Sequence, residues 1–249
     1  MKKAICILLC CGLVSCQESK KKENAQAIID KAIEVSGGAG YTDSRVSFKF
    51  RNMDYSSERG TTGKTLSRSF IQDSIAVFDM LQGGAFTRKV AGKPVVVPDT
   101  MAVKYANSIN SVHYFVRLPY GLNDKAVKKR YLGESEIEGK SYHKIEVTFQ
   151  EEGGGDDFDD VYVYWFNKAT NKPDFLAYEF HVNGGGKRFR KAFNERYVGG
   201  IRFVDYLNYK PLTNDVSVYE MDSLFTNNQL QLLSQIELED IQVIPGSYN

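Results

Sequence analysis

The residues best suited to covalent or metal chemistry are the four cysteines, which all lie near the N-terminus: Cys6, Cys10, Cys11 and Cys16. A thiolate can act as a nucleophile or bind zinc, and two thiols can form a disulfide. Because no cysteine follows Cys16, the rest of the chain can hold neither a disulfide, nor a cysteine metal site, nor a cysteine nucleophile. That part of the protein must be stabilised by packing alone.

The segment around these cysteines has the pattern of an export signal. Lys2 and Lys3 precede an apolar run over 4–14 that is too short to span a bilayer, and a small residue precedes Cys16. The letters LVSC ending at Cys16 resemble the lipobox of bacterial lipoproteins. The resemblance implies that residues 1–15 are a signal peptide and that the Cys16 thiol then carries a diacylglycerol group. The alternative is an ordinary secretory signal that happens to end in cysteine.

Acyl chains on Cys16 would hold the protein at a membrane, because each buried methylene contributes about 0.8 kcal/mol. Gln17, rather than Asp, follows the cysteine, which in the sorting pattern of lipoproteins favours the outer membrane. The periplasmic face and the cell surface both remain open. Residues 16–24 continue as QESKKKEN after the cysteine, without apolar periodicity, and are expected to form a flexible tether.

Polyanion binding is not expected from the charge balance. Lys and Arg number 32 against 31 Asp and Glu, so the formal net charge is only +1. No summed electrostatic field would hold nucleic acid. Nucleic acid is therefore excluded as a partner.

Two further motifs fit simple turns better than ligand sites. Residues 59–65, RGTTGKT, are similar to a phosphate-binding loop, but Glu58 stands where its first glycine belongs and no strong helix follows, so a hairpin turn is expected. An acidic loop could offer oxygens to Ca²⁺, but its spacing is not that of an EF-hand. We expect a solvated loop from its residues, which are Glu151, Glu152, Asp156, Asp157, Asp159 and Asp160.

No catalytic residue, metal ligand or cofactor is predicted. His113, His143 and His181 each stand alone in the sequence, without a partner at zinc-ligand spacing. No G-x-S-x-G elbow occurs, and a Schiff-base lysine would need a deep pocket, usually in a (β/α)₈ barrel. A charged group could contact a head group or phosphate, or equally form solvated strand faces; its members are Arg188, Arg190, Arg196, Arg202 and Asp205.

Two amphipathic helices are expected. The first covers Ala25–Ser36 and stops at two glycines, Gly37 and Gly38. The second covers Thr100–Val112, where apolar residues recur every three or four positions, and an extended segment over 113–117 should follow.

Most of the remaining chain alternates as strands do. Arg45–Arg51 alternates cleanly, whereas Val161–Phe166 is apolar on both faces, so something must cover both of its sides. Lys187–Val198 suits a helix as well as a strand, and we favour a strand because Gly199 and Gly200 lead into a hairpin partner. A helical turn over 219–225 and one long closing strand over 230–243 complete the pattern.

Two helices and about eleven strands cannot alternate as βαβ units, so the sheet must be antiparallel. Strands of about ten residues reach roughly 33 Å, and a twisted sheet of that length tends to curl. The expected fold is mainly β (α+β): a curled antiparallel sheet that forms an incomplete β-barrel with two helices as a lid, in one domain over 25–249.

This element order resembles the LolA/LolB lipoprotein-sorting superfamily, in which helices cover an incomplete barrel and its hydrophobic cavity binds acyl chains. Four stretches also look like a lipoprotein family of unknown function, which lends no catalytic residues: FVRLPYGLNDKA (115–126), YLGESEIEGKSYHKIEVTF (131–149), VYVYWFN (161–167) and GIRFVDYLNY (200–209).

The resemblance implies that aromatic and aliphatic side chains line the concave face and adapt to acyl chains by area burial. The candidates are Phe48, Phe50, Tyr114, Phe115, Leu118, Tyr162, Tyr164 and Phe166. Three functions follow from the sequence: a membrane-anchored protein that binds a lipid or another apolar ligand, a structural or interaction protein of the envelope without a ligand, and a hydrolase or lyase acting on an apolar substrate.

Overall fold

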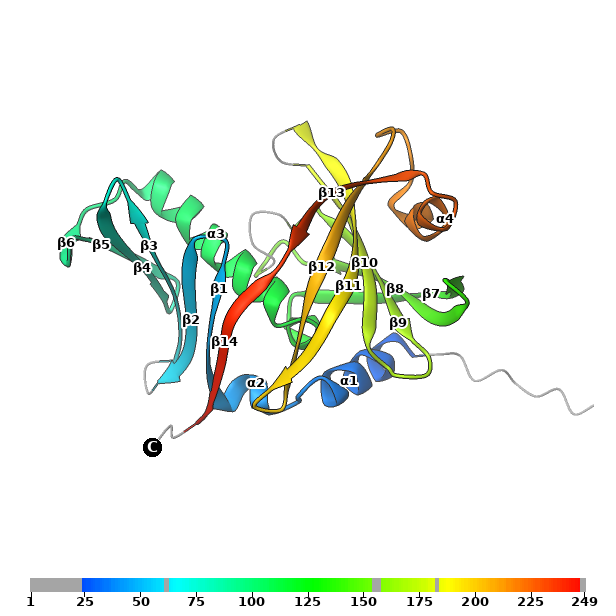
Figure 1. The fold of residues 1–249 in the computed structure, drawn as a ribbon, viewed down its shortest axis with the longest axis horizontal. Helices are drawn as coiled ribbons and strands as arrows, with labels where there is room; N and C mark the ends of the chain where they lie inside the picture. Colours follow the sequence, from blue (N-terminus) through cyan, green and yellow to red (C-terminus); the bar gives the residue numbers. More distant parts are fainter. Residues whose placement is uncertain (1–23, 61–62, 154–157, 182–183, 247–249) are drawn as a thin grey trace, which may run out of the picture.

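The computed structural model describes residues 24–60, 63–153, 158–181 and 184–246, where two antiparallel sheets of seven strands each lie next to one another (Figure 1). The N-terminal sheet has the order β14 (Leu238–Pro245), β1 (Ser44–Phe50), β2 (Met53–Gly60), β3 (Gly63–Gln72), β4 (Ile75–Gln82), β5 (Ala85–Val90) and β6 (Lys93–Val95). The C-terminal sheet has the order β13 (Leu230–Ile236), β12 (Ile201–Pro211), β11 (Gly186–Val198), β10 (Pro173–Phe180), β9 (Val161–Asn167), β8 (Lys140–Phe149) and β7 (Val127–Ile137).

The chain passes from one sheet to the other at Glu237, the only residue between β13 and β14. The expected single strand over 230–243 is therefore wrong. Its backbone leaves the β12 ladder at Leu238, whose N–H donates to Asp205 Oδ1 (2.9 Å) and whose carbonyl accepts from Arg196 Nη2 (2.7 Å). At the opposite ends, β6 and β7 each pair on one side only, so the barrel is incomplete, as the sequence predicts.

The first helix, α1 (Ala25–Val35), confirms its prediction. It begins at Asn24, whose side chain accepts a hydrogen bond from the Gln26 N–H at 2.9 Å. It ends where Gly37 and Gly38 adopt φ values of +130° and +51°, which residues other than glycine rarely adopt. A short helix, α2 (Gly40–Asp43), leads into β1.

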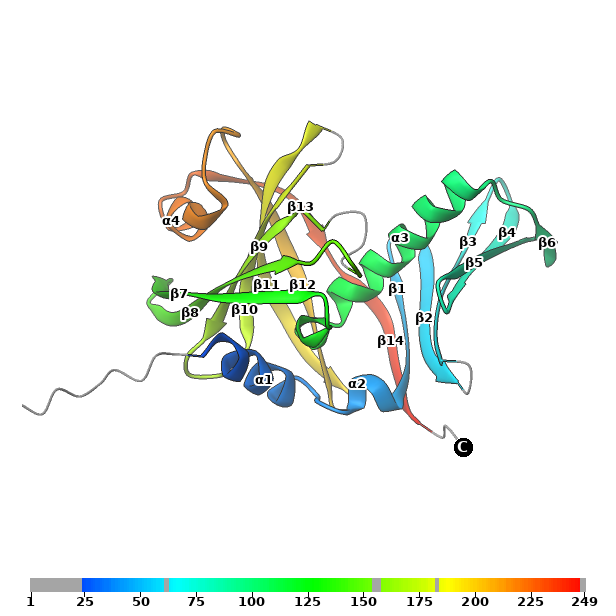
Figure 2. The ribbon, with the colours of Figure 1, turned by 180° about the vertical axis from the view of Figure 1, so that it is seen from behind.

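The second helix, α3, is longer than predicted and covers Asp99–Val116. The expected extended segment over 113–117 is wrong because His113 and Val116 continue the buried stripe of Ile109 and Val112 at three- and four-residue steps. Seen from behind, α3 runs across the N-terminal sheet towards the C-terminal sheet, while α1 lies along the lower end of the latter (Figure 2). None of the helices in the described part of the chain has the length and apolarity needed to cross a membrane.

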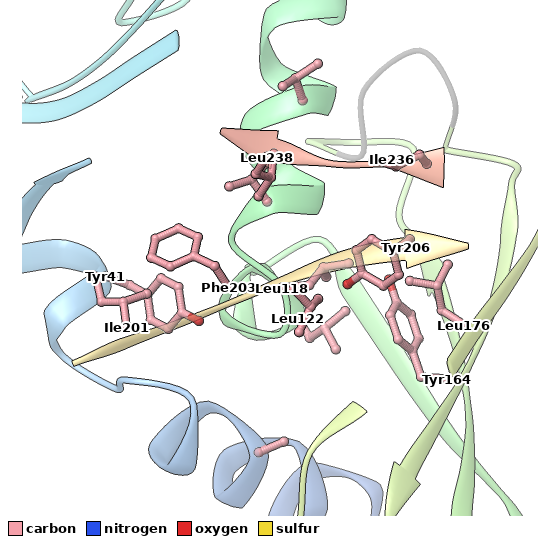
Figure 3. Packing of buried hydrophobic residues seen from close by; sticks show 14 of the residues in the cluster. Tyr41, Leu118, Leu122, Tyr164, Leu176, Ile201, Phe203, Tyr206, Ile236 and Leu238 are labelled. Atoms are coloured by element: carbon pink, nitrogen blue, oxygen red, sulfur yellow. The ribbon is translucent and has the colours of Figure 1, made fainter. Parts of the chain in front are cut away.

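The inner faces of the two sheets, together with α1 and α3, enclose one large apolar cluster, here called the inner cluster. Tyr164, Leu176 and Tyr206, from β9, β10 and β12, point towards Leu118 and Leu122 of the turn after α3 (Figure 3). That turn contains the 3₁₀ helix η1 (Tyr120–Asn123). The inner cluster therefore joins both sheets to the lid helices.

A second apolar cluster, the outer cluster, covers the other face of the C-terminal sheet. It packs the 3₁₀ helix η3 (Val218–Glu220) and α4 (Met221–Thr226) against Val163 and Trp165 of β9. The helical turn predicted over 219–225 and the strand predicted over Lys187–Val198 are both confirmed. Because Tyr164 and Phe166 face the inner cluster, β9 is covered on both sides, as its sequence requires.

Asp222 of α4 should stabilise the packing of α4 against the outer cluster. Its carboxylate accepts from Trp165 Nε1 at 3.0 Å and from Lys144 Nζ at 2.9 Å, and Trp165 is fully buried. Asp222→Ala leaves both donors without this partner, so we expect the free energy of unfolding to fall by about 2 kcal/mol. Emission of Trp165, the chain's one tryptophan, should also shift to the red and become quenchable by acrylamide.

Asp215→Ala is the matched control, because Asp215 is exposed in the segment before η3. It should change the free energy of unfolding by less than about 0.5 kcal/mol. Equal quenching in Asp222→Ala and the native protein would contradict the assigned role of Asp222.

Candidate functional site

All eight side chains predicted to line a ligand site meet in or against the inner cluster. Five of them are buried in its packing: Phe48, Phe50, Leu118, Tyr164 and Phe166. Tyr114, Phe115 and Tyr162 are only half-buried. Much of the predicted lining is thus ordinary core, and accessible inner surface begins where these three residues lie.

From Tyr162, half-buried rings continue across the end of the C-terminal sheet. The rings of Tyr162 and Tyr178 stack at 5.5 Å, Phe149 meets Tyr162 edge-on at 5.7 Å, and Phe180 lies 6.0 Å from Tyr178. Two arginines of β11 lie over these rings: Arg188 over Phe180 and Arg190 over Tyr178. We call this set the arginine–aromatic strip: Phe149, Tyr162, Tyr178, Phe180, Arg188 and Arg190.

Charged side chains of the N-terminal sheet bind the N-terminal half of α3. The buried Asp79 carboxylate accepts from Arg68 Nε at 2.8 Å and from Arg88 Nε at 2.6 Å. Arg68 also donates to Ser108 Oγ at 3.0 Å, and the Arg88 guanidinium lies 4.0 Å from the centre of the Tyr105 ring. This cluster was not predicted from the sequence. Its only signal is that Arg68 and Asp79 alternate in phase with the buried Leu66 of β3 and Val77 of β4.

His113 connects the other half of α3 to the same sheet. Its Nε2 lies 3.3 Å from the Ser67 carbonyl, and its ring meets Phe48 and Tyr55 edge-on at 5.5 and 5.7 Å. Burial in these apolar surroundings lowers the pKa of His113 to about 3, and the nearby charges of Lys64 and Arg117 lower it further. His113 is therefore neutral at physiological pH.

Two hollows open elsewhere on the surface, and none of the eight predicted residues lines either. One of about 600 Å³ lies on the outward face of the N-terminal sheet, where its lining includes Lys49, Ile71, Phe78 and Lys89. The other, of about 280 Å³, lies between α2, η1 and the β2–β3 hairpin. Most of the residues that line this smaller hollow have polar or charged side chains, and we call it the polar hollow.

The polar hollow brings together an amine and a carboxyl group whose pKa values shift in opposite directions. Desolvation lowers the pKa of Lys64 to about 8, and the charge of Arg117 adds to this effect. Desolvation also raises the pKa of Asp124, against the opposing charges of Lys64 and Arg117. Both residues are nevertheless exposed as a whole, so solvent screens their charges.

The two turn-like motifs fold as follows. Strands β2 and β3 pair antiparallel as far as Gly60 opposite Gly63, with Arg59 opposite Lys64, as a hairpin requires and a phosphate loop does not. Residues 61 and 62 of this motif lie outside the described part of the chain. His181 is not isolated: its Nδ1 lies 3.5 Å from both Asp159 and Asp160. Three such ligands fall short of the six to eight oxygens that Ca²⁺ prefers. Asp156, Asp157 and Cys16 lie outside the described residues.

The charged group of β11 and β12 divides into two parts. Arg196 pairs with Asp205 at 3.0 Å, and the buried Arg202 pairs with Glu195. Arg188 and Arg190 instead face the inner side, within the arginine–aromatic strip. The expected solvated strand face is therefore wrong for Arg202 and Asp205, which are buried in ion pairs. A contact with a head group or phosphate stays a prediction for Arg188 and Arg190.

Two open antiparallel sheets around a helix-covered apolar cluster define a LolA-like fold. In agreement, a LolA superfamily protein of Nitrosomonas europaea superposes with a TM-score of 0.50, at 13% identity, over 88% of this chain and 93% of that chain. The chain belongs to a family of unknown function, DUF6503, whose model matches residues 2–240.

Two other solved structures are more distant. A domain described as an outer membrane lipoprotein-sorting protein of Vibrio parahaemolyticus gives a TM-score of 0.45 at 13% identity, over 88% of this chain and 93% of that chain. A DUF1329 family protein of Desulfovibrio piger gives 0.43 at 9% identity, over 88% and 92%. No curated protein sequence matches this chain.

His113 should make the fold sensitive to acid. An unfolded histidine has a pKa near 6.5, whereas the folded value is about 3, so the unfolded state binds the extra proton between these values. Stability from this group is therefore complete above about pH 6.5 and falls as the pH decreases towards 3. Urea unfolding at pH 7 and pH 5 should show roughly 2 kcal/mol more loss in the native protein than in His113→Phe.

The exposed His181 provides the comparison, and His181→Gln should follow the native protein more closely than His113→Phe does. Parallel pH profiles for His113→Phe and the native protein would show that His113 does not carry this dependence.

Proposed function

We propose that this protein is a lipid-anchored protein of the cell envelope, held at the outer membrane through Cys16, that binds a lipid or another apolar ligand on its inner face. The observation that carries the proposal is the arginine–aromatic strip, where rings stay half-buried although the adjoining inner cluster is closely packed. Apolar surface left accessible on a concave face gains free energy when a ligand covers it.

The fold and the N-terminal pattern support the same proposal. The half-barrel is open between its edge strands β6 and β7, and a lipidated Cys16 would keep the domain close to a source of lipids. The structural neighbours include proteins described as LolA superfamily and as lipoprotein-sorting, which agrees with a role at the envelope. The ligand would rest on half-buried rings without displacing the buried core.

Ligand binding can be tested on a chain that starts at Gln17. All described helices and strands lie within 25–245, so this chain keeps every described contact without the anchor. After purification from cells, mass spectrometry of an organic-solvent extract should find acyl lipid in a fixed ratio to protein. A fluorescent fatty acid should bind as well, and Tyr162→Ala should weaken it about tenfold through lost contact area.

Phe225→Ala is the matched control, because Phe225 is a half-buried ring packed against the outer cluster on the opposite face of the same sheet. It should bind the fatty acid as the native protein does. Empty extracts together with no uptake of the fatty acid would favour the alternative of an envelope protein with a structural or interaction role.

The polar hollow favours a second candidate function, a hydrolase or lyase acting on an apolar substrate. A lysine whose pKa approaches neutrality beside a carboxyl group with a raised pKa is a combination found in acid–base catalysis. Because Lys64 and Asp124 are exposed, we rank this function below ligand binding.

The Lys64 amine should titrate near pH 8 in the NMR spectrum of ¹³C-methylated lysines. Asp124→Asn should lower that pKa further, because it removes a negative charge that stabilises the ammonium form. An enzyme would also cleave acyl ester probes with a rate that rises as Lys64 loses its proton, and Lys64→Met would abolish cleavage. Cleavage unchanged in Lys64→Met would dismiss this function.

A further inference from the structure

We infer that Arg188 and Arg190 form an oxyanion subsite that holds the carboxylate or phosphate head group of an anionic amphiphile. This inference rests on the proposed function and names the class of ligand. The amphiphile's acyl chain would lie along the rings of the arginine–aromatic strip, and its charged end would meet the two guanidinium groups.

The ion pairs of β11 differ between its two faces. On the outer face, Lys187 pairs with Glu179 at 2.8 Å and Lys191 pairs with Glu138 at 2.5 Å. On the inner face, neither Arg188 nor Arg190 has a carboxylate of the described residues within ion-pair distance, 4.0 Å. The two inner cations are thus the ones without a counter-charge.

The register of the strands places both guanidinium groups on the strip. Arg188 lies opposite Tyr178 and Arg190 lies opposite Leu176, a member of the inner cluster. Arg190 is 5.1, 5.5 and 6.0 Å from the rings of Tyr178, Phe115 and Tyr206, and its Nη2 donates to the Tyr178 hydroxyl at 3.1 Å. These contacts fix the orientation of Arg190 but leave its charge uncompensated.

Two polar atoms beside these rings have no hydrogen-bond partner among the described residues. They are Arg190 Nε, a donor, and Asn208 Oδ1, an acceptor, and both are buried. Arg190 and Asn208 are direct partners in the β11–β12 ladder, so the two atoms lie in one region of the inner face. Asn208 is itself held by its Nδ2, which donates to Ser234 Oγ at 3.2 Å.

A ligand that carries an oxyanion with a neighbouring hydroxyl would supply hydrogen-bond partners for both atoms. The planar guanidinium donates in a fork that suits carboxylate and phosphate oxygens. A hydroxyl beside the oxyanion, as on a glycerol or sugar, would donate to Asn208 Oδ1. An uncharged apolar ligand would instead bury Arg190 and Arg188 without a counter-charge, which is unfavourable.

The chain starting at Gln17 allows a direct test with ligands of one acyl length. Oleate and 1-oleoyl lysophosphatidate should each bind at least tenfold more tightly than oleyl alcohol, which has the same chain and no charge. Arg190→Gln should remove this preference, and Arg188→Gln should reduce it. Arg190→Lys, which keeps the charge, should retain part of it. Thermal unfolding of each variant shows whether it is folded.

Lys191→Gln is the control, because it removes one positive charge from the opposite face of the same strand. It should keep the native preference for the anionic ligands. An equal affinity of the native protein for oleate and oleyl alcohol, or a preference that survives in Arg190→Gln and Arg188→Gln, would overturn the subsite.

Two further outcomes separate this proposal from its neighbours. If oleate, lysophosphatidate and oleyl alcohol all fail to bind, the proposed function fails as a whole. If inorganic phosphate alone binds as tightly as lysophosphatidate, the arginines bind a free oxyanion, and the proposal that the ligand is an amphiphile is contradicted. We expect phosphate to compete only at concentrations at least a hundredfold higher.

Discussion

The fold depends on how the chain crosses from one sheet to the other at Glu237, just before Leu238. The side chains of Asp205 and Arg196 bind the backbone N–H and carbonyl of Leu238, in place of backbone partners on β12. Asp205 is buried and pairs with Arg196, so loss of the Arg196 side chain would leave the buried charge of Asp205 without its counter-charge. Because no cysteine follows Cys16, no disulfide can link the two sheets. Their relative orientation must therefore be fixed by this hydrogen-bonded crossing and by the inner cluster.

The lid helix α3 is attached in two physically different ways. Its C-terminal half buries Val112 and Val116 in the inner cluster, whereas its N-terminal half lies on the paired charges of Arg68, Asp79 and Arg88. The apolar half gains free energy from the area it buries, whereas the buried Asp79 carboxylate is held by charge-assisted hydrogen bonds that salt screens little. Only the C-terminal half shares packing with the strip, through Phe115.

The sequence was sufficient for features that depend on local patterns. Alternation in β1 and on both faces of β9, the glycines after α1 and the open antiparallel architecture are all as predicted. Local sequence patterns were not sufficient where a side chain that is distant along the chain determines the structure. Nothing local to 230–243 shows that Asp205 and Arg196 interrupt the strand, and nothing local to Arg188 or Arg190 shows that neighbouring carboxylates pair with Lys187 and Lys191 instead.

The same limit explains why eight side chains that meet at the inner cluster do not by themselves make a cavity. A period of two assigns Phe48, Tyr164 and Phe166 to the inner face but does not say whether another side chain already covers them. The inner face is in fact uneven, closely packed around Phe166 and half-buried around Tyr162 and Tyr178. A ligand therefore does not require an empty barrel. It requires only that the accessible end of the face carry both apolar area and unmet polar groups, and these occur together at Arg190.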